Sequence, residues 1–263
     1  MNAIIKREMR LGLKNLLIWA VTVGGLGFIC TLMYTSMDGD MQEMAEQFSN
    51  MGAFADAFGM STLSIATLNG FFATEVGTVH GLGSAMFAAF IASCMLSKEE
   101  DGHTGEFLYS LPIARWKAVT AKAVAILLNL LIFTLICGAF YVLGFAVLKE
   151  DIPWEKMIRF MGSMCLMNVE VSSIAYFLSA ISSRNRMGIG LGVALIVYTY
   201  DLMGRVVPSM KDYLFIGPFS YTNASEIFGG IDAPKYSIMV ACIVIVLAAS
   251  AAYVTYTRRD LNV

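Results

Sequence analysis

Residues 119–148 read VTAKAVAILLNLLIFTLICGAFYVLGFAVL, and Lys122 is the only charged side chain among them. A helix rises about 1.5 Å per residue, so this run is long enough to cross the hydrocarbon core of a bilayer, which is about 30 Å thick. Because no water is available there to satisfy backbone amides, a spanning segment of this kind must form a helix. The stretch predicts a membrane-spanning helix.

Five more apolar runs of comparable length lie on either side of it, at residues 16–36, 76–96, 157–181, 187–207 and 237–256. The composition agrees, because 57% of the residues are hydrophobic and only 14% are charged, whereas a soluble domain carries about 25% charge. A transmembrane β-barrel would need many segments of about ten residues with alternating polarity, a pattern that the sequence lacks. We therefore predict an all-α integral membrane protein in which residues 1–263 form one transmembrane domain with six spans.

Lys and Arg residues concentrate on one side of these spans. If the N-terminus is cytoplasmic, twelve of the 18 basic residues fall inside and six fall outside, and residues 37–75 contain none. Cytoplasmic loops carry an excess of Lys and Arg. The pattern therefore predicts a multi-pass protein of a bacterial-type plasma membrane with both termini in the cytoplasm.

Several classes of chemistry lack their usual motifs. There is no G-x-x-x-x-G-K-[ST] to cradle phosphates, no G-x-S-x-G and no H-E-x-x-H, so we expect no catalytic residues and no ATP hydrolysis by this chain. The five cysteines lie in apolar runs without a CxxC pair, and His80 and His103 belong to no cluster of metal-ligand side chains. We expect neither a metal site nor a cofactor. The net charge of −2 argues against nucleic-acid binding.

Two segments outside the spans have amphipathic helical patterns. Residues 1–15 combine apolar with basic side chains, which suits an interfacial helix at an anionic inner leaflet that turns sharply into the first span. In the outer loop at residues 38–75, apolar side chains recur at three- and four-residue steps from Met41 to Phe58. We expect that helix to lie on the outer membrane surface, to cap a cavity mouth, or to serve packing alone.

The cytoplasmic loop at residues 97–118 contains a short predicted helix. Thr104 can cap it and Glu106 is favourable in its first turn, while Pro112 ends it and begins the next helix. This helix would display Phe107, Leu108 and Tyr109 from an otherwise charged loop. A groove in a partner protein would account for such a surface.

This loop resembles a motif in the permease subunits of type-2 ABC transporters, the ABC-2-type exporter family. Residues 100–122 contain Gly-x-Thr-Gly-Glu-Phe-Leu, then Ser-Leu-Pro-Ile-Ala-Arg and a trailing Ala-Lys, similar to the family pattern between its second and third spans. The likeness continues at residues 179–195, where Ser-Ala-Ile-Ser-Ser-Arg-Asn-Arg precedes three glycines, and it ends at Arg258-Arg259-Asp260-Leu261. These motifs, in this order and spacing, extend over nearly the whole chain.

The resemblance implies a membrane permease subunit that forms the translocation pathway of an ATP-driven exporter and couples to a separate ATP-binding subunit. In such systems a coupling helix in this loop docks in a groove of the ATPase; by position its residues here are Thr104, Gly105, Glu106, Phe107, Leu108, Tyr109 and Leu111. Tyr109 departs from the Leu that the family often has, which should alter the fit. The working unit would contain two permease chains, as a homodimer or heterodimer, and two ATPase chains that carry ATP and Mg, surrounded by membrane lipids.

Two polar residues stand deep in the fourth predicted span. Glu170 and Asn168 lie within residues 157–181, at a depth where an ionisable group costs at least about 2.5 kcal/mol and usually faces a bundle interior or cavity. They are candidates for the translocation path, as contacts for a cation, a proton or a polar substrate; hydrogen-bonded packing is the alternative. Asp201 and Arg205 lie four residues apart, and we predict that they pair on one helix face.

Three glycines begin the fifth predicted span, at Gly188, Gly190 and Gly192. No strand precedes them, so a nucleotide-binding fingerprint is disfavoured. Gly188 and Gly192 form a GxxxG pair, which predicts close helix packing.

Two other classes of protein remain as alternatives. A secondary transporter would be expected to show internal repeats and broken spans, and the sequence has no clear repeat. A membrane-embedded lipid-processing enzyme would need paired acids or a His cluster at one membrane depth, where Glu170 stands nearly alone. Association with a P-loop subunit would support the permease, whereas activity of the isolated chain would support one of the alternatives.

Overall fold

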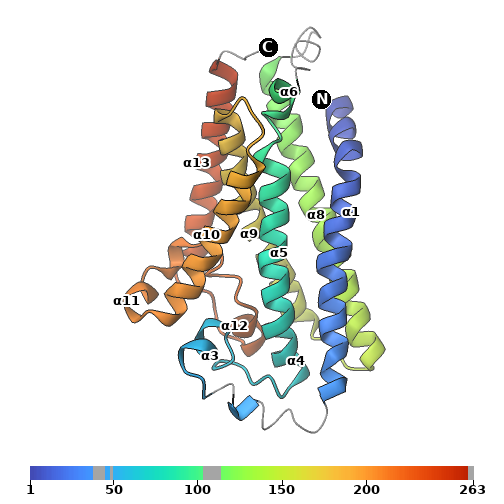
Figure 1. Ribbon diagram of the computed structural model, residues 1–263, viewed down its shortest axis with the longest axis vertical. Coiled ribbons are helices and arrows are strands. Elements are labelled where there is room, and N and C mark those ends of the chain that lie inside the picture. The colour runs from blue at the N-terminus through green and yellow to red at the C-terminus, as the bar shows by residue number, and fades with distance from the viewer. Residues whose placement is uncertain (38–44, 48–49, 103–113, 260–263) are drawn as a thin grey trace.

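The computed structural model describes residues 1–37, 45–47, 50–102 and 114–259, and every regular element within them is helical (Figure 1). Six segments of this described part are long and apolar enough to cross a membrane: Asn2–Ser36, Leu68–Ser93, Arg115–Leu148, Trp154–Ile181, Met187–Val206 and Ser237–Arg258. Each contains most of one span expected from the sequence. The prediction of an all-helical protein with six long apolar helices is confirmed.

The spans consist of the following elements. The first is α1 (Asn2–Met33), continued by the 3-10 helix η1 (Tyr34–Met37). The second joins α4 (Leu68–Phe71), the π-helix η2 (Phe72–Val76) and α5 (Gly77–Ser93). The other four are α8 (Arg115–Leu148), α9 (Trp154–Ile181), α10 (Met187–Val206) and α13 (Ser237–Arg258). Shorter helices connect them: α3 (Ala53–Ala57), α6 (Lys98–Asp101), α11 (Pro208–Lys211), η3 (Leu214–Ile216) and α12 (Ala224–Gly229).

The second span starts earlier than the apolar run at residue 76 suggests. Thr67 has an extended backbone, and its side chain accepts a hydrogen bond from the amide of Gly70 at 3.1 Å. This cap satisfies one of the amides that have no partner within a helix. The helix can therefore begin at Leu68, before the apolar run does.

The two ends of the bundle carry different elements (Figure 1). The start of α1, the end of α13 and the short α6 lie together at one end, which we call the α6 end. The helices α3, α4, α11 and α12 lie toward the other end, which we call the α12 end. An even number of spans places both termini on one side of a membrane, as this arrangement does.

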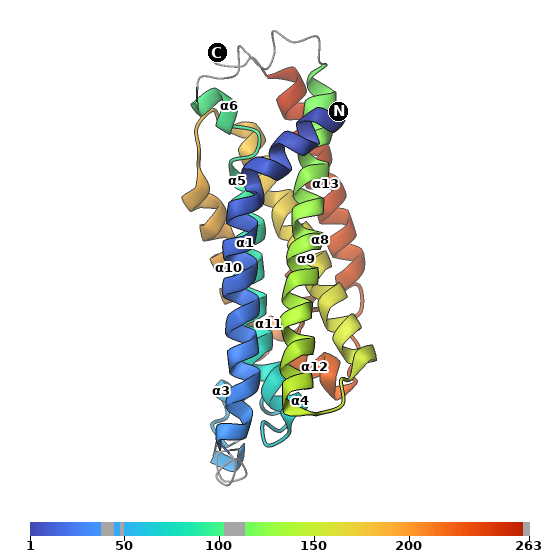
Figure 2. The same cartoon turned by 90° about the vertical axis from the view of Figure 1, so that its right-hand side faces the viewer.

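Helices α5 and α9 form the centre of the bundle. In the most apolar stretch of each span, the share that is buried inside the protein is 61% for the second span and 56% for α9. The share is 22% for α10 and 11% for α13. Helix α1 packs along α8, α13 along α9, and α10 against α5 (Figures 1 and 2). Aromatic side chains fill the middle, and the rings of Phe87 and Phe133 stack with their centroids 4.6 Å apart. Helices α10 and α13 are therefore the most exposed to the surroundings.

Glycines set the close approach of α1 to α8 and of α10 to α5. A Cβ on Gly27 would lie 2.4 Å from the ring of Tyr141, and one on Gly190 would lie 2.5 Å from the Cβ of Ser93. Gly188 and Gly192 would meet no atom within 4 Å. Among the described residues, the predicted close packing through Gly188 and Gly192 is therefore wrong. Gly190, which lies between them, is the glycine that faces α5.

The N-terminal segment is continuous with the first span. Residues 1–15 belong almost entirely to α1, an unbroken helix that bends and leans across α8 near its start (Figure 2). Ile4 is buried there against Ala118 and Ala121 of α8. The expected sharp turn into the membrane is thus a bend within one helix, and the interfacial location of this segment stays a prediction.

The predicted outer helix is only partly within the described residues. Residues 45–47 are helical and Ala53–Ala57 forms α3, whereas residues 38–44 and 48–49 lie outside the described part. Gly52, with φ of 55°, precedes α3 in a conformation that no α-helix contains. One uninterrupted helix from Met41 to Phe58 is therefore ruled out.

The connection between α10 and α13 folds back into the bundle. Phe219 and Tyr221 are both 4% exposed, and Phe219 lies next to Gly81 of α5. The Tyr221 hydroxyl donates a hydrogen bond to the Glu170 carboxylate at 2.7 Å. Since Glu170 lies about 24 Å along α9 from Trp154, this connection reaches far inside the helical bundle.

Candidate functional site

The predicted docking residues Thr104, Gly105, Glu106, Phe107, Leu108, Tyr109 and Leu111 lie outside the described residues. The structure does describe the segments that enter and leave them. On the entering side, residues 95–102 include α6, and on the leaving side α8 begins at Arg115. Any movement of the loop between them must pass through these two attachments.

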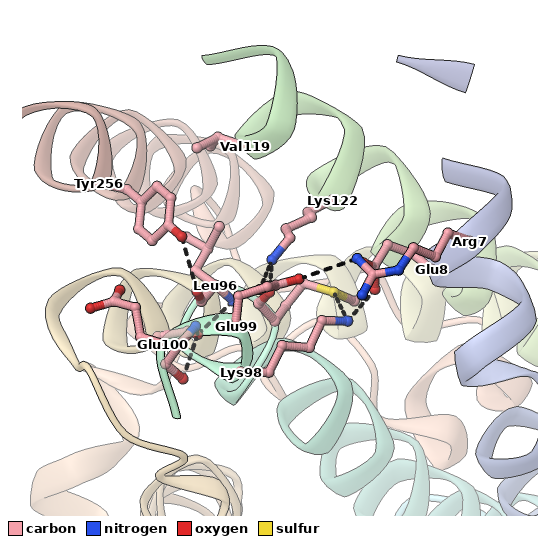
Figure 3. Close-up of polar contacts among 12 residues, drawn as sticks. Arg7, Glu8, Leu96, Lys98, Glu99, Glu100, Val119, Lys122 and Tyr256 are labelled. Atoms are coloured by element: carbon pink, nitrogen blue, oxygen red, sulfur yellow. Dashed lines mark hydrogen bonds and ion pairs between the residues drawn. The ribbon is translucent and has the colours of Figure 1, made fainter. Parts of the chain in front are cut away.

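A buried ion pair attaches α6 to α8 (Figure 3). The ammonium group of Lys122 contacts the carboxylate of Glu99, and the two side chains are only 1% and 2% exposed. Lys122 also donates to the backbone carbonyl of Met95 at 2.7 Å. Lys122 lies about two helical turns into α8, and Glu99 supplies the compensating charge that a buried ammonium needs.

Helix α1 adds a second set of charges to the same place (Figure 3). Glu8, with a side chain only 1% exposed, pairs with Lys98 of α6. Arg7 lies 3.7 Å from both Glu8 and Glu99. The start of α1 is thus joined through charge to the helix that leads into the predicted docking loop.

The end of α13 completes the attachment of α6. Arg259 pairs with Glu100, and the guanidinium of Arg115 donates to the backbone carbonyl of Arg259 at 2.9 Å. The Tyr256 hydroxyl donates to the carbonyl of Leu96 at 3.2 Å, as Figure 3 shows. The C-terminal span therefore holds both the start of α8 and the segment before α6.

Helix α9 holds the segment that joins α5 to α6. The hydroxyl oxygen of Ser179 accepts hydrogen bonds from the backbone amides of Leu96 and Ser97, at 2.9 Å and 3.2 Å. Tyr176, one turn away, donates to the carbonyl of Val119 at 2.8 Å. Residues 95–102 are therefore bonded to α1, α8, α9 and α13. We call the acidic and basic residues that pair in and around this segment the α6 charge cluster. They are Arg7, Glu8, Lys98, Glu99, Glu100, Lys122 and Arg259.

This cluster was not expected from the sequence. The sequence places Lys122 on the basic side of the membrane and in the family motif, but not in a buried pair, although it is the single charge in residues 119–148. Glu8 is likewise the only acid among the first residues of a basic segment. A lone charge in an apolar run and a lone acid in a basic run are both signals of a buried partner, but neither says which residue that partner is.

The two predicted translocation-path residues are both buried but have different surroundings. Glu170 is 2% exposed and accepts the hydrogen bond from Tyr221. Asn168 is fully buried, and neither atom of its amide has a hydrogen-bond partner in the described part of the chain. Residues two apart point to different sides of a helix, so the structure does not bring these side chains together into one site.

The predicted pair at the end of α10 is confirmed and is larger than expected. Arg205 makes two hydrogen bonds to the Asp201 carboxylate, at 2.7 Å and 3.0 Å. Its Nη1 also lies 3.3 Å from Glu226 of α12, to which the amide of Asn223 donates at 3.0 Å. Arg205 therefore fixes α12 to α10, and a residue 21 positions away could not be inferred from helix spacing.

His80 has a partner that the sequence did not reveal. Its Nδ1 lies 2.7 Å from the Tyr141 hydroxyl in the middle of the bundle, among aromatic rings. Among the residues with assigned positions, no group of three His, Cys, Asp or Glu side chains could hold a metal ion. The contacts of His80 are those of a packing residue.

Comparison with known protein families gives a match over nearly the whole chain. The sequence profile described as ABC-2 family transporter protein matches residues 2–261. Among curated protein sequences, no match to the chain was found. Because the profile extends over nearly the entire chain, this multi-pass membrane protein belongs to the ABC-2 transporter family.

Proposed function

We propose that the chain is the permease subunit of an ATP-driven exporter and that it couples to a separate ATP-binding subunit through residues 104–111. Two permease chains and two ATPase chains would form the working unit, with ATP and Mg on the ATPase. Membership of the ABC-2 family, whose permeases typically do not hydrolyse ATP, supports a separate motor.

The observation that carries the proposal is the attachment of residues 95–102 to four helices. A push on the docking loop is transmitted into α6, where the carboxylates of Glu99 and Glu100 are bonded to Lys122 of α8 and to Arg259 at the end of α13. Buried charges resist separation, since parting them leaves each without compensation. A displacement of the loop would therefore move the ends of several spans together instead of bending the loop alone.

In this proposal both termini and the α6 end face the cytoplasm, as the distribution of Lys and Arg predicts. The translocation path would include Glu170 and Asn168, which are buried at mid-span depth. Ionisable and polar side chains at such depth usually line a cavity or pair within a bundle. Glu170 has a partner in Tyr221 that could be exchanged for a polar group of the cargo.

The docking assignment is tested with the double variant Glu106→Ala/Phe107→Ala. The variant chain should insert into the membrane normally but fail to retain the ATPase on purification, or should allow ATP hydrolysis that no longer drives transport. The matched control is Asp212→Ala/Tyr213→Ala, an acid and an aromatic residue at the α12 end, where both are exposed. If the docking variant assembles and transports as well as this control does, residues 104–111 are not the docking element.

A further inference from the structure

Two hollows flank one ridge of α9 toward the α12 end. One is a groove of about 790 Å³ between α8 and α9, and the other is a pocket of about 280 Å³ between α9, α12 and the start of α13. Ile158, Gly162 and Leu166 of α9 line both. Residues four apart lie above one another on a helix, so these three form the ridge that separates the hollows.

The ridge has a notch at its middle residue. Gly162 is exposed, and a Cβ placed on it would meet no atom within 4 Å. The residue one turn before it, Ile158, projects with 67% of its surface exposed. The absence of a side chain at Gly162 therefore leaves a passage from the pocket to the groove.

The groove is apolar and lies inside two candidate spans. Its lining runs along α8 from Leu131 to Val142 and along α9 from Trp154 to Val169, and both helices belong to segments long and apolar enough to cross a membrane. The eleven helical rises between Leu131 and Val142 make it about 16 Å long, a length that accommodates most of an acyl chain. In a membrane, the hydrocarbon of the bilayer surrounds this groove.

The pocket, in contrast, contains charged and polar groups. Arg159 and Glu226 both line it, together with Ser163. The guanidinium of Arg159 pairs with Asp232 at 3.2 Å, but the two side chains are 46% and 94% exposed, so water screens this pair and makes it easy to exchange. Arginine has five N–H donors in a planar fork that matches a phosphate group, and among the described residues Asp232 is the one side chain to which Arg159 donates.

The polar pocket, the notch and the apolar groove follow one another in the order of the parts of a lipid. We propose that a membrane glycerophospholipid binds here, with its phosphate at Arg159 and one acyl chain passing over Gly162 into the groove between α8 and α9. Arg159 lies about 8 Å along α9 from Trp154, where the helix starts, and the groove leads from there toward the middle of the bundle. This is the orientation that a lipid of the leaflet at the α12 end has.

The experiment uses the full chain in vesicles that contain a small fraction of phosphatidylethanolamine with a photoactivatable diazirine in one acyl chain. After illumination, adducts are mapped by mass spectrometry. They should be enriched on residues 131–142 and 157–169 over the exposed face of α13, which presents Ile243, Val246 and Leu247 to the same hydrocarbon. Diacylglycerol with the same labelled chain but no phosphate should lose this enrichment.

Two variants with matched controls test the notch and the charge. Gly162→Leu should reduce the groove adducts to the level on α13, whereas Gly25→Leu should not, although its side chain also enters open space. Arg159→Gln should make the two labelled lipids equivalent, whereas Lys211→Gln, at an exposed lysine of α11, should keep the preference for the phospholipid.

The proposal is overturned by equal labelling of the groove and of α13, by the same enrichment with diacylglycerol, or by groove adducts that survive Gly162→Leu. The comparison of the two lipids on the unaltered chain needs no variant, so a substitution that fails to fold does not block the test. No ATPase subunit takes part, and the result is therefore independent of the docking assignment.

Discussion

Lys122 and Glu99 illustrate how much a single buried charge matters in this protein. Replacing Lys122 by Met should lower the free energy of unfolding by about 3–5 kcal/mol, because the carboxylate of Glu99 then stays buried without its cation. The measurement is chemical unfolding of the purified protein in detergent. Lys117→Met, at an exposed position of the same helix, is the control and should change the stability by no more than about 0.5 kcal/mol.

The double variant Glu99→Met/Lys122→Met distinguishes the effect of an unpaired buried charge from the effect of losing the contact between α6 and α8. Two apolar side chains of similar volume often replace a buried ion pair without loss of stability. The double variant should therefore recover most of the free energy of unfolding that Lys122→Met loses. A single variant as stable as Lys117→Met would show that the buried pair does not hold α6 to α8.

Gly27 tests the packing of α1 on α8 at the same scale. Ala at this position places a Cβ 2.4 Å from the ring of Tyr141, so this ring, whose hydroxyl is bonded to His80, must shift. Overpacking of this kind costs about 1–3 kcal/mol. The melting temperature of Gly27→Ala should fall, while that of Gly25→Ala, where the space is open, should not; equal values would contradict the contact.

At the scale of elements, hydrogen bonds and an ion pair to α9 and α10 hold the connection between α10 and α13 against the bundle. Tyr221→Phe removes the donor of the hydrogen bond to Glu170 and leaves a buried acceptor unpaired, at a cost of about 1–3 kcal/mol. Amide hydrogen exchange should therefore accelerate across residues 214–229. Tyr213→Phe, at a residue of the same connection that is 60% exposed, should leave the exchange unchanged.

Glu170→Gln distinguishes the two roles considered for Glu170. The amide keeps an oxygen that can accept the bond from Tyr221 but cannot ionise, so exchange across residues 214–229 should slow or stay close to that of the unaltered chain. If Glu170 contacts a cation, a proton or the cargo, transport or its pH dependence should change. Unchanged transport with unchanged pH dependence would leave Glu170 a packing residue.

At the scale of the whole molecule, the orientation of the bundle is open to direct measurement. Asp101 lies exposed at the α6 end and Asp232 is 94% exposed near the other end. In intact cells a membrane-impermeant maleimide should label Asp232→Cys but not Asp101→Cys, and permeabilised cells should show both. The unaltered chain, whose five cysteines lie in apolar segments, gives the background; the reverse labelling pattern would invert the topology.

The number, kind and approximate limits of the spans could be predicted from the sequence because they depend on local properties. Apolar length decides whether a segment can cross a bilayer, and backbone hydrogen bonding then requires a helix. The pair Asp201–Arg205 was predictable for the same reason, since helix geometry brings residues four apart together. Membership of the ABC-2 family is likewise read from the sequence, since the family profile matches residues 2–261.

The contacts between distant segments depended on tertiary structure alone. Glu99 and Lys122, Glu8 and Lys98, and Tyr221 and Glu170 are each paired across different elements, and no periodicity in a sequence specifies which helices become neighbours. Likewise, the sequence marked Gly188 and Gly192, but the rotation of α10 about its axis turned Gly190 toward α5. Hydrophobicity by itself determined that this protein spans a membrane, whereas the packing of the helices decided where its few charges meet, because a buried charge must find its partner in space.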